Sequence, residues 1–415
     1  MEFLEHLKSY LSEKEISDLE TSLSKKSQHA LLLNTDKMSQ ETLLSIYPNL
    51  KRHPIVNNAF IYDKDEIDLG RSVYHELGCF YLQEPSAMLP AYLLNPQPGD
   101  LVLDLCAAPG GKSMQASFLM KNEGLIVSND ISKQRTFAIS ENAERLGRGN
   151  LLITNNDFSL IYDKFLNTFD KIILDAPCSG SGMFRKENKM LEDWSYQKVI
   201  KNAEIQKQLI MMAYDMLKPG GKMVYSTCSF SYEEDEEIID FLLANSDAEL
   251  VKIPDSLLYY HSKNNGHGIH LFPSLFPGEG HYIALITKPG VLVNKLGEDY
   301  YSKKEKFGDY LFTISEPFNT KYLNVIRYGV KIGQVDKNDI RFDYHYARFV
   351  KDFEPALEID IETLEKYYRG ETINEPFAKG YVLIKYQGIN VDIAKSDGRI
   401  IKNRLPKGLR KKFVL

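Results

Sequence analysis

Cysteine is scarce in this chain, and its spacing excludes two common roles. The 415 residues contain four cysteines, and no two of them form a C-x-x-C pair. The spacing therefore fits no zinc site, and four thiols in so long a chain are too few for a disulfide framework. We expect reduced thiols that are either buried or chemically active: Cys79, Cys106, Cys178 and Cys228.

Metal-ligand patterns are missing elsewhere as well. His261, His267 and His270 lie in one segment, at spacings that fit no zinc pattern. The acidic run at 233–237 is typical of a helix N-terminus, where negative charge is favourable. We therefore expect no metal site.

Long apolar runs and internal repeats are also absent. No run approaches the roughly 18 apolar residues that a membrane span needs, and the charged N-terminal stretch has no signal-peptide core. We expect a cytoplasmic protein with no membrane partner. The length of 415 residues predicts two or three domains, and nothing in the sequence demands more than a monomer.

The chain has no overall positive charge. Its formal net charge is −6, which taken alone disfavours a nucleic-acid binder. The segment 395–412 is an exception, with eight Lys or Arg residues against one Asp. This segment is either a solvated tail or a contact for nucleic acid. Tyr381, Tyr386 and Phe413 lie near it and could stack on bases, but core packing is the commoner role of such rings.

Strand and helix patterns alternate between residues 98 and 288, which is typical of a doubly wound parallel sheet. Strand-like runs cover 101–106, 124–130, 151–157, 171–177, 222–229 and 282–288. Helical patterns cover 80–94, 112–120, 132–146 and 196–217, and the last should stop at Pro219-Gly220-Gly221. We predict an α/β, Rossmann-like core over 71–290, a small α+β module over 1–70 and a β-rich module over 300–415.

A glycine-rich turn follows the first of these strands. The string DLCAAPGGKS at 104–113 has neither the G-x-G-x-x-G nor the G-x-x-x-x-G-K-[ST] spacing, which disfavours NAD and ATP. A helix that starts near Lys112 directs free N–H groups at a ligand in this turn. Acids also end three successive strands, at Asp104, Asp130 and Asp157. This set favours S-adenosylmethionine over a dinucleotide, although single strand-end acids often cap the next helix.

Two cysteines end apolar strands fifty residues apart, in DAPCSGSG at 175–182 and YSTCS at 225–229. Small polar neighbours leave Cys178 and Cys228 accessible, and both should reach the carboxyl edge where α/β proteins bind ligands. A thiolate that adds to C6 of a cytosine makes C5 nucleophilic enough to accept a methyl group. Asp175 can bond the N3 edge of the base, and Lys112 can help to polarise it.

In this order the motifs resemble the Nol/Nop/Sun family of RNA cytosine-5 methyltransferases. DLCAAPGGKS, Asp130, DAPCSGSGMFRK and YSTCS carry the resemblance, together with FYLQEPSAMLP, LEDWS and the segment 267–282. The flanking regions are similar to the bacterial RsmF-type enzymes, which modify 16S ribosomal RNA near the decoding centre. These have an N-terminal extension and a C-terminal PUA-like module. DNA cytosine-5 enzymes carry an E-N-V string, which this chain lacks, so RNA is favoured.

The resemblance implies a role for each matching residue. Cys228 would be the nucleophile, and Cys178 would assist release of the methylated product. Asp175 and Lys112 would face the target base. The cofactor, S-adenosylmethionine, would be lined by Cys106, Ala107, Ala108, Pro109, Gly110, Gly111, Lys112, Asp130, Arg135, Asp157 and Asp175.

The implied reaction is methylation of cytosine C5 in RNA through a covalent bond from cysteine to C6. The implied substrate is 16S rRNA, free or in the 30S subunit, and the target base must leave its stack to reach the pocket. Two alternatives stay open at this point. The substrate could be tRNA, or the chain could be a ribosome-assembly factor that binds RNA with little catalysis.

Overall fold

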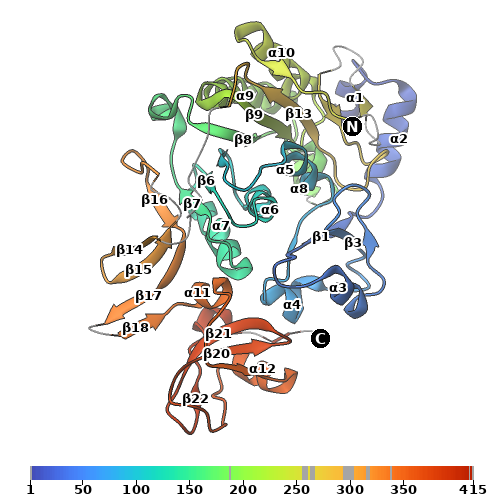
Figure 1. Cartoon of the computed structure of the whole chain (residues 1–415). Coiled ribbons are helices and arrows are strands. Elements are labelled where there is room, and N and C mark those ends of the chain that lie inside the picture. The colour runs from blue at the N-terminus through green and yellow to red at the C-terminus, as the bar shows by residue number, and fades with distance from the viewer. Residues whose placement is uncertain are drawn as a thin grey trace.

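A computed structural model describes residues 2–186, 188–254, 260–261, 267–292, 303–314, 318–336, 339–410 and 412–413. A central mixed sheet forms the middle of the molecule, and the two ends of the chain build smaller modules beside it (Figure 1). No helix among these residues has the length and apolar character needed to cross a membrane.

Five parallel strands form the centre of the sheet, in the order β9-β8-β5-β6-β7. They are β5 Leu101–Asp104, β6 Leu125–Asn129, β7 Leu151–Thr154, β8 Phe169–Asp175 and β9 Leu217–Thr227. The main helices that connect or follow them are α6 Gly111–Leu119, α7 Lys133–Leu146, α9 Tyr196–Met216 and α10 Glu236–Asn245. The chain order reverses between β5 and β8, and ligands of doubly wound sheets bind beside such a point, at the carboxyl ends of the strands.

Four short strands extend the sheet beyond β9: β10 Glu249–Leu250, β11 Tyr260–His261, β12 Ile269–His270 and β13 Tyr282–Thr287. β13 runs antiparallel to β9. Shorter helices fill the connections: η2 Ser86–Met88, α5 Leu89–Leu94, η3 Phe158–Leu160, η4 Tyr162–Phe165, η5 Ser181–Met183, α8 Asn188–Glu192 and η6 Tyr232–Glu234. The predicted doubly wound core is confirmed.

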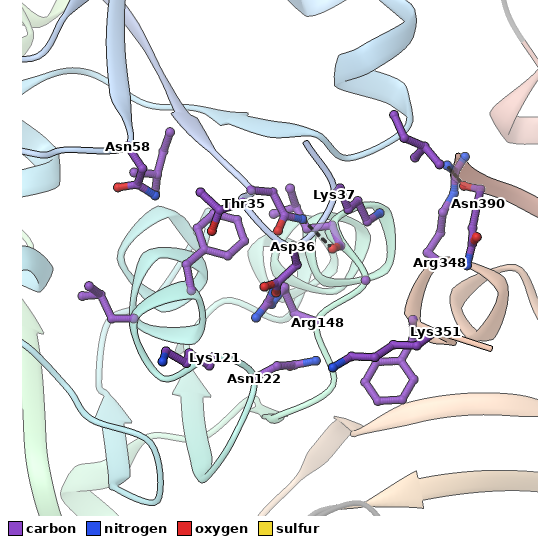
Figure 2. Close-up of a pocket in the computed structure, with 18 of the residues that line it drawn as sticks. Thr35, Asp36, Lys37, Asn58, Lys121, Asn122, Arg148, Arg348, Lys351 and Asn390 are labelled. Atoms are coloured by element: carbon purple, nitrogen blue, oxygen red, sulfur yellow. Dashed lines mark hydrogen bonds and ion pairs between the residues drawn. The ribbon is translucent and has the colours of Figure 1, made fainter. Parts of the chain in front are cut away.

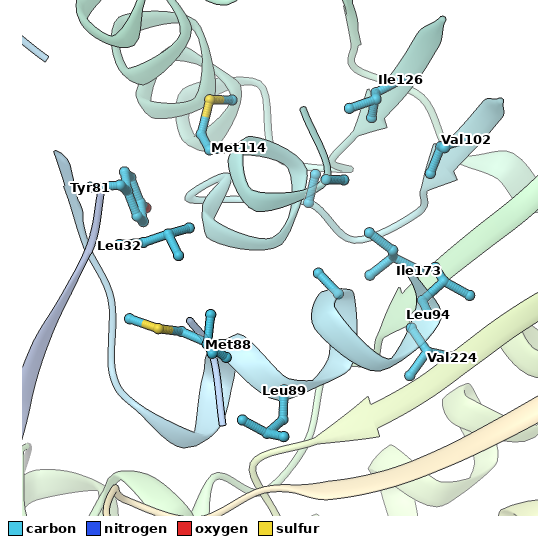
Figure 3. Close-up of a cluster of buried hydrophobic side chains, with 14 of the residues drawn as sticks. Leu32, Tyr81, Met88, Leu89, Leu94, Val102, Met114, Ile126, Ile173 and Val224 are labelled. Carbon is cyan, nitrogen blue, oxygen red and sulfur yellow. The ribbon is translucent and has the colours of Figure 1, made fainter. Parts of the chain in front are cut away.

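Alternating strand residues pack on opposite faces of the sheet, since side chains in a strand have a period of two. Val102 and Ile173 belong to one apolar cluster with Leu94 of α5 and Met114 of α6 (Figure 3). Their neighbours, such as Leu103, belong to a second cluster that includes residues of α9 and α10. Because both faces are covered, the strands are apolar over most of their length, and their runs can be recognised in the sequence.

The N-terminal module contains a sheet in the order β2-β3-β1-β4. Its elements are α1 Glu2–Leu7, α2 Glu13–Leu23, β1 His29–Leu33, α3 Gln40–Ile46, β2 Lys51–Arg52, β3 Ala59–Tyr62, η1 Leu69–Arg71, α4 Val73–Glu76 and β4 Phe80–Leu82. Helix α1 lies apart from this sheet: Phe3 packs edge-on against Phe184 and Trp194, at centroid distances of 5.0 and 5.5 Å.

The C-terminal part contains two four-stranded sheets, β14-β15-β17-β18 and β19-β20-β21-β22. Their elements are β14 Lys303–Phe307, β15 Tyr310–Ile314, β17 Val330–Asp336, β18 Asp339–Phe342, α11 Tyr344–Phe349, β19 Ala356–Glu358, α12 Ile361–Tyr368, β20 Gly380–Tyr386, β21 Ile389–Ser396, β22 Ile401–Lys402 and η7 Lys407–Leu409. A further strand, β16 Val325–Tyr328, leaves these sheets and pairs antiparallel with β7 of the core. The aromatics near the basic segment pack internally: Tyr386 is buried, and Phe413 lies 4.6 Å from Tyr368 between ring centroids.

Two local predictions are wrong. The segment 80–94 is not one helix, because Phe80–Leu82 pairs with β1 as strand β4 before η2 and α5 begin. The strand predicted from 222 begins earlier: α9 does stop before Pro219-Gly220-Gly221, at Met216, but β9 starts at Leu217 and includes these three residues. Gly220 has φ +77, and a Cβ there would lie 2.3 Å from the backbone of Leu292, so the close approach requires glycine.

Candidate active site

The glycine-rich turn joins β5 to α6 and is shaped by its own backbone bonds. The Ala107 N–H donates to the Asn129 carbonyl at 2.7 Å, and the Gly110 N–H donates to the Ala107 carbonyl at 2.7 Å. Gly110 is the N-cap of α6 at φ +104, and a Cβ there would lie 3.3 Å from Ile139. The free N–H groups of the first turn of α6 therefore lie at the sheet's switch point.

Asp130 and Arg135 hold this turn from the side of the next strand. The Asp130 carboxylate accepts from the Ala108 N–H at 3.3 Å and from the Ser132 N–H at 2.9 Å. Arg135 lies 3.4 Å from the same carboxylate and donates to the Ala108 carbonyl at 2.7 Å. The sequence-based grouping of the turn with Asp130 and Arg135 corresponds to direct contacts.

Asp104 lies at the end of β5, directly before the turn, and only one of its two carboxyl oxygens has a hydrogen-bond partner among the described residues. Its Oδ2 accepts from the Ser113 hydroxyl at 2.6 Å, while Oδ1 is buried without a hydrogen-bond partner among the described residues. Burial raises the pKa of Asp104 to about 7. A buried carboxyl oxygen without a partner fits a ligand that brings a hydrogen-bond donor or a positive charge.

The remaining residues of the predicted cofactor set differ in their surroundings. Cys106 lies in the same turn, and desolvation raises the pKa of its thiol, so it stays protonated. Asp157 is exposed at the end of β7, where it accepts from the Ser159 N–H at 3.0 Å and caps η3. The capping role that single strand-end acids often have is thus present at Asp157.

The two cysteines meet at the carboxyl edge of the sheet. Cys178 follows β8, Cys228 follows β9, and their Sγ atoms lie 3.1 Å apart. Both thiols are partly exposed. The hydrogen bond with Cys228, together with desolvation, raises the pKa of Cys178 well above its ordinary value. Cys178 therefore keeps its proton and can donate it toward the sulfur of Cys228.

Asp175 and Lys112 form an ion pair beside the thiols. The Lys112 Nζ lies 2.8 Å from Asp175 Oδ2, and the Ser226 hydroxyl donates to Oδ1 at 2.7 Å. Desolvation alone would raise the pKa of Asp175, but Lys112, His281 and the hydrogen bond from Ser226 together lower that pKa below its ordinary value. The pair presents a fixed carboxylate and a fixed cation to the same edge of the sheet.

Glu234 connects the two cysteine loops, a contact that no sequence motif predicts. Its buried carboxylate accepts from the Ser179 N–H at 2.7 Å and from the Ser179 and Ser229 hydroxyls at 2.5 Å each. These serines directly follow Cys178 and Cys228. Only the position of Glu234 in the acidic run 233–237 was visible beforehand, and that run does precede and begin α10 as predicted.

A second set of buried groups lies behind this network. Carboxylate oxygens of Asp235 and Glu236 and a ring nitrogen of His270 lie within 4.8 Å of one another. His270 Nε2 is 2.8 Å from the Glu236 carboxylate, and Asp235 accepts from the Thr227 hydroxyl at 2.5 Å. Thr227 precedes Cys228, so these acids support the second cysteine loop from below. The His261 side chain lies outside the described residues.

A Rossmann-like core with a glycine-rich turn at its switch point and two thiols at the same edge defines a methyltransferase fold with flanking modules. Comparison with known proteins agrees along the chain. The family described as 16S rRNA methyltransferase RsmB/F matches residues 91–287. The N-terminal domain of 16S rRNA methyltransferase RsmF matches residues 1–85, and the RsmF PUA domain matches residues 354–411.

Individual relatives support the same assignment. Ribosomal RNA small subunit methyltransferase F of Vibrio campbellii is 31% identical, over 98% of this chain and 96% of the relative. The chain therefore belongs to the ribosomal RNA small subunit methyltransferase F family. This confirms the resemblance drawn from the motifs, including the PUA-like module. The predicted boundaries at residues 70 and 300 stay predictions.

Solved structures share the fold over the larger part of the chain. A methyltransferase homolog protein from Pyrococcus horikoshii has a TM-score of 0.59 at 30% identity, over 68% of this chain and 93% of that one. NSun6 from Pyrococcus horikoshii, solved with SFG, has a TM-score of 0.64 at 22% identity, over 69% and 98%. The second likeness shows the fold alone.

Proposed function

We propose that this rRNA methyltransferase transfers a methyl group from S-adenosylmethionine to C5 of a cytosine in 16S rRNA, through a covalent bond between Cys228 and C6. One observation carries the proposal: two thiols 3.1 Å apart lie at the same sheet edge as the Asp175–Lys112 pair. A reaction that only positioned a nucleophilic base nitrogen or hydroxyl would need no such pair of thiols.

The residues of the turn fit S-adenosylmethionine. The unpartnered Asp104 Oδ1 suits its ammonium group, the N–H groups at the start of α6 suit its carboxylate, and Asp130 suits its ribose hydroxyls. NSun6, a fold neighbour, is described with SFG, an analogue of this cofactor. When bound, S-adenosylmethionine supplies an electrophilic methyl group.

Four side chains, those of Cys228, Cys178, Lys112 and Asp175, act on the base. The Cys228 thiolate adds to C6 and forms an S–C6 bond, which pushes the ring electrons toward C5. Asp175 accepts from the amino group beside N3 and holds Lys112 in place, and the Lys112 ammonium stabilises the negative charge that develops in the ring. C5 then takes the methyl group as its bond to the cofactor sulfur breaks. The C5 proton passes to water, the C5–H electrons form the C5=C6 double bond, and the S–C6 bond breaks with its electrons returning to sulfur. The protonated Cys178 thiol, which lies against that sulfur, stabilises the departing thiolate and assists release.

The test is methyl transfer from radiolabelled S-adenosylmethionine to purified 30S subunits, free 16S rRNA and total tRNA, followed by nucleoside analysis. We expect label in 5-methylcytidine from ribosomal material. Label in tRNA alone would support the proposed methylation of cytosine but would show that 16S rRNA is not the substrate. Label in any nucleoside other than 5-methylcytidine would overturn the chemistry. The Cys228→Ala variant should transfer no methyl group, and full transfer by that variant would exclude Cys228 as nucleophile.

A further inference from the structure

A cavity of about 1120 Å³ lies where the three modules meet. It is lined by residues from the segments 32–37 of the N-terminal module, 115–123 and 146–148 of the core, and 346–351 of the C-terminal part. Asn122 precedes β6 and Arg148 precedes β7, so the cavity lies toward the amino ends of the parallel strands. The cysteines follow the carboxyl ends of β8 and β9, and the cavity is therefore distinct from the candidate active site.

Three side chains of this lining have buried polar atoms that no other group in the described ranges satisfies. They are Asn34 Oδ1, both polar atoms of the Gln115 amide, and Arg348 Nε. Asn34, Gln115 and Arg348 are 0%, 2% and 3% exposed. Each unsatisfied buried group costs about 1–3 kcal/mol. The wall therefore fits a ligand that offers both donors and acceptors, as the edge of an unpaired nucleobase does.

The cavity lining carries more cations than acids, the acids being Asp36 and Glu123, and this balance favours an anionic ligand. The Arg148 guanidinium pairs with the Asp36 carboxylate at 2.6 Å. Burial lowers the pKa of Lys37 well below its ordinary value, which disfavours its charged form. Lys121 and Lys351 are exposed and lie along one side of the cavity, near Asn122 (Figure 2). Neither has an ion-pair partner within the described part of the chain. Such free cations suit backbone phosphates, in a chain whose net charge is −6.

We infer that this cavity holds one unpaired nucleotide of the RNA substrate and anchors the RNA at a distance from the reacting cytosine. The inference rests on the proposed function for its choice of RNA. The Gln115 amide, which has no hydrogen-bond partner among the described residues, bonds the base edge after a side-chain rotation, and Lys121 and Lys351 contact the adjoining phosphates. Asn34 stays in place, because its Nδ2 donates to the Gly78 and Leu146 carbonyls. The volume of the cavity is ample for a nucleotide.

Two variants separate base recognition from phosphate contact. The double variant Lys121→Glu/Lys351→Glu removes the cations, and Gln115→Met removes the amide at nearly constant volume. A matched control, Lys14→Glu/Lys25→Glu, makes the same charge change on exposed lysines outside the cavity lining. The probe is a 16S rRNA transcript, titrated by filter binding over a series of salt concentrations. Binding of S-adenosylmethionine, measured by calorimetry, checks that each variant keeps its fold.

For the double cavity variant we expect RNA affinity at least 10-fold weaker and a salt slope shallower by about 1.4, which is about 0.7 for each lost phosphate contact. Gln115→Met should weaken binding several-fold with an unchanged slope, because it removes no charge. Wild-type binding by Gln115→Met would overturn the nucleotide site, as would an equal change of slope in the control pair.

Photo-crosslinking identifies the occupant directly. A transcript that contains 4-thiouridine should crosslink to peptides from 115–122 or 346–351, and absence of those peptides would overturn the inference. Free nucleoside monophosphates should not suppress these crosslinks; suppression at equal nucleotide concentration would assign the cavity to a free nucleotide instead. These measurements need no methyl transfer, so a failure of the proposed reaction would leave them interpretable.

Discussion

At the scale of single residues, the site depends on groups whose protonation is set by their neighbours. Cys178 keeps its proton because it bonds Cys228, and Asp175 stays ionised because Lys112 lies beside it. Burial raises the pKa of Asp104 to about 7. The pKa values of these two acids at one sheet edge are thus shifted in opposite directions: that of Asp175 downward beside a cation, and that of Asp104 upward by desolvation.

Cys178→Ala tests the role of the second thiol. If Cys178 assists departure of the Cys228 thiolate, its removal slows release more than addition. We expect the variant to accumulate a covalent adduct with RNA that survives denaturing electrophoresis, while a Cys178→Ala/Cys228→Ala double variant forms none. Normal turnover without an adduct would exclude the assigned role.

Asp104 predicts a distinct pH dependence of stability. Its native pKa is about 7 against an ordinary value of 3.8, so between those pH values the native state holds a proton that the unfolded chain has lost. The free energy of unfolding therefore falls as pH rises through this window, by on the order of a few kcal/mol. Buried histidines contribute in the opposite direction over the same range, so the fall should appear in the difference between the wild type and Asp104→Asn, measured by urea unfolding from pH 4 to 8.

The exposed carboxylate of Asp157 supplies the control for this experiment. Asp157→Asn removes a strand-end acid of the same type and should keep the wild-type pH profile. An Asp104→Asn profile as steep as that of the wild type would mean that Asp104 does not hold its proton in the folded chain.

At the scale of elements, the alternation of strands and helices was visible in the sequence, and so were most residues of the site. Apolar runs and the glycine-rich turn are local signals, and parallel strands bring their carboxyl ends together, which predicted the meeting of Cys178, Cys228 and Asp175. Strand β4 was missed because its partner β1 lies about fifty residues earlier, and the sequence did not predict that β16 pairs with β7 of the core. Pairing between distant segments leaves little trace in either segment alone.

Glu234 was missed for the same reason, since 55 residues separate it from Ser179. Its carboxylate bonds the residues after both cysteines and so fixes the spacing of the two thiols. Glu234→Gln keeps the shape but places an amide N–H₂ among donors, so one or more bonds are lost. We expect kcat to fall by about 10- to 100-fold, as small displacements of reacting groups cost in other enzymes, with little change in the KM for RNA.

Glu237→Gln is the matched control. Glu237 belongs to the same acidic run as Glu234, but its carboxylate pairs with Lys207 at the surface. Single-turnover kinetics should separate the two variants. Equal rates would show that the bridge between the cysteine loops does not position the thiols.

At the scale of the whole molecule, the C-terminal part is fastened to the core through polar contacts as well as through β16. Arg327 of β16 bonds Glu144 and donates to the Ser140 hydroxyl at 2.9 Å, both on α7. Its guanidinium also donates to His345 Nδ1 at 2.6 Å, and His345 Nε2 donates to the Arg148 carbonyl at 3.0 Å. The buried imidazole of α11 therefore links β16 to the loop before β7. The cavity with Lys121 and Lys351 lies at the same junction.

This junction predicts that mild acid loosens the C-terminal part. Burial and the Arg327 guanidinium lower the pKa of His345 well below 6.5, so the native state excludes a proton that the unfolded chain binds. The contribution of His345 is fully present above pH 6.5 and is lost progressively as pH falls below it. A protonated Nδ1 would face Arg327 and lose its bond. Hydrogen exchange at pH 7.5 and 5.5, corrected for intrinsic rates, should show reduced protection in β16 and α11 at the lower pH, with protection of β5 and β8 unchanged. In His345→Asn, whose amide cannot titrate, protection of β16 should be the same at both values; a wild-type response in that variant would assign the acid sensitivity to another group.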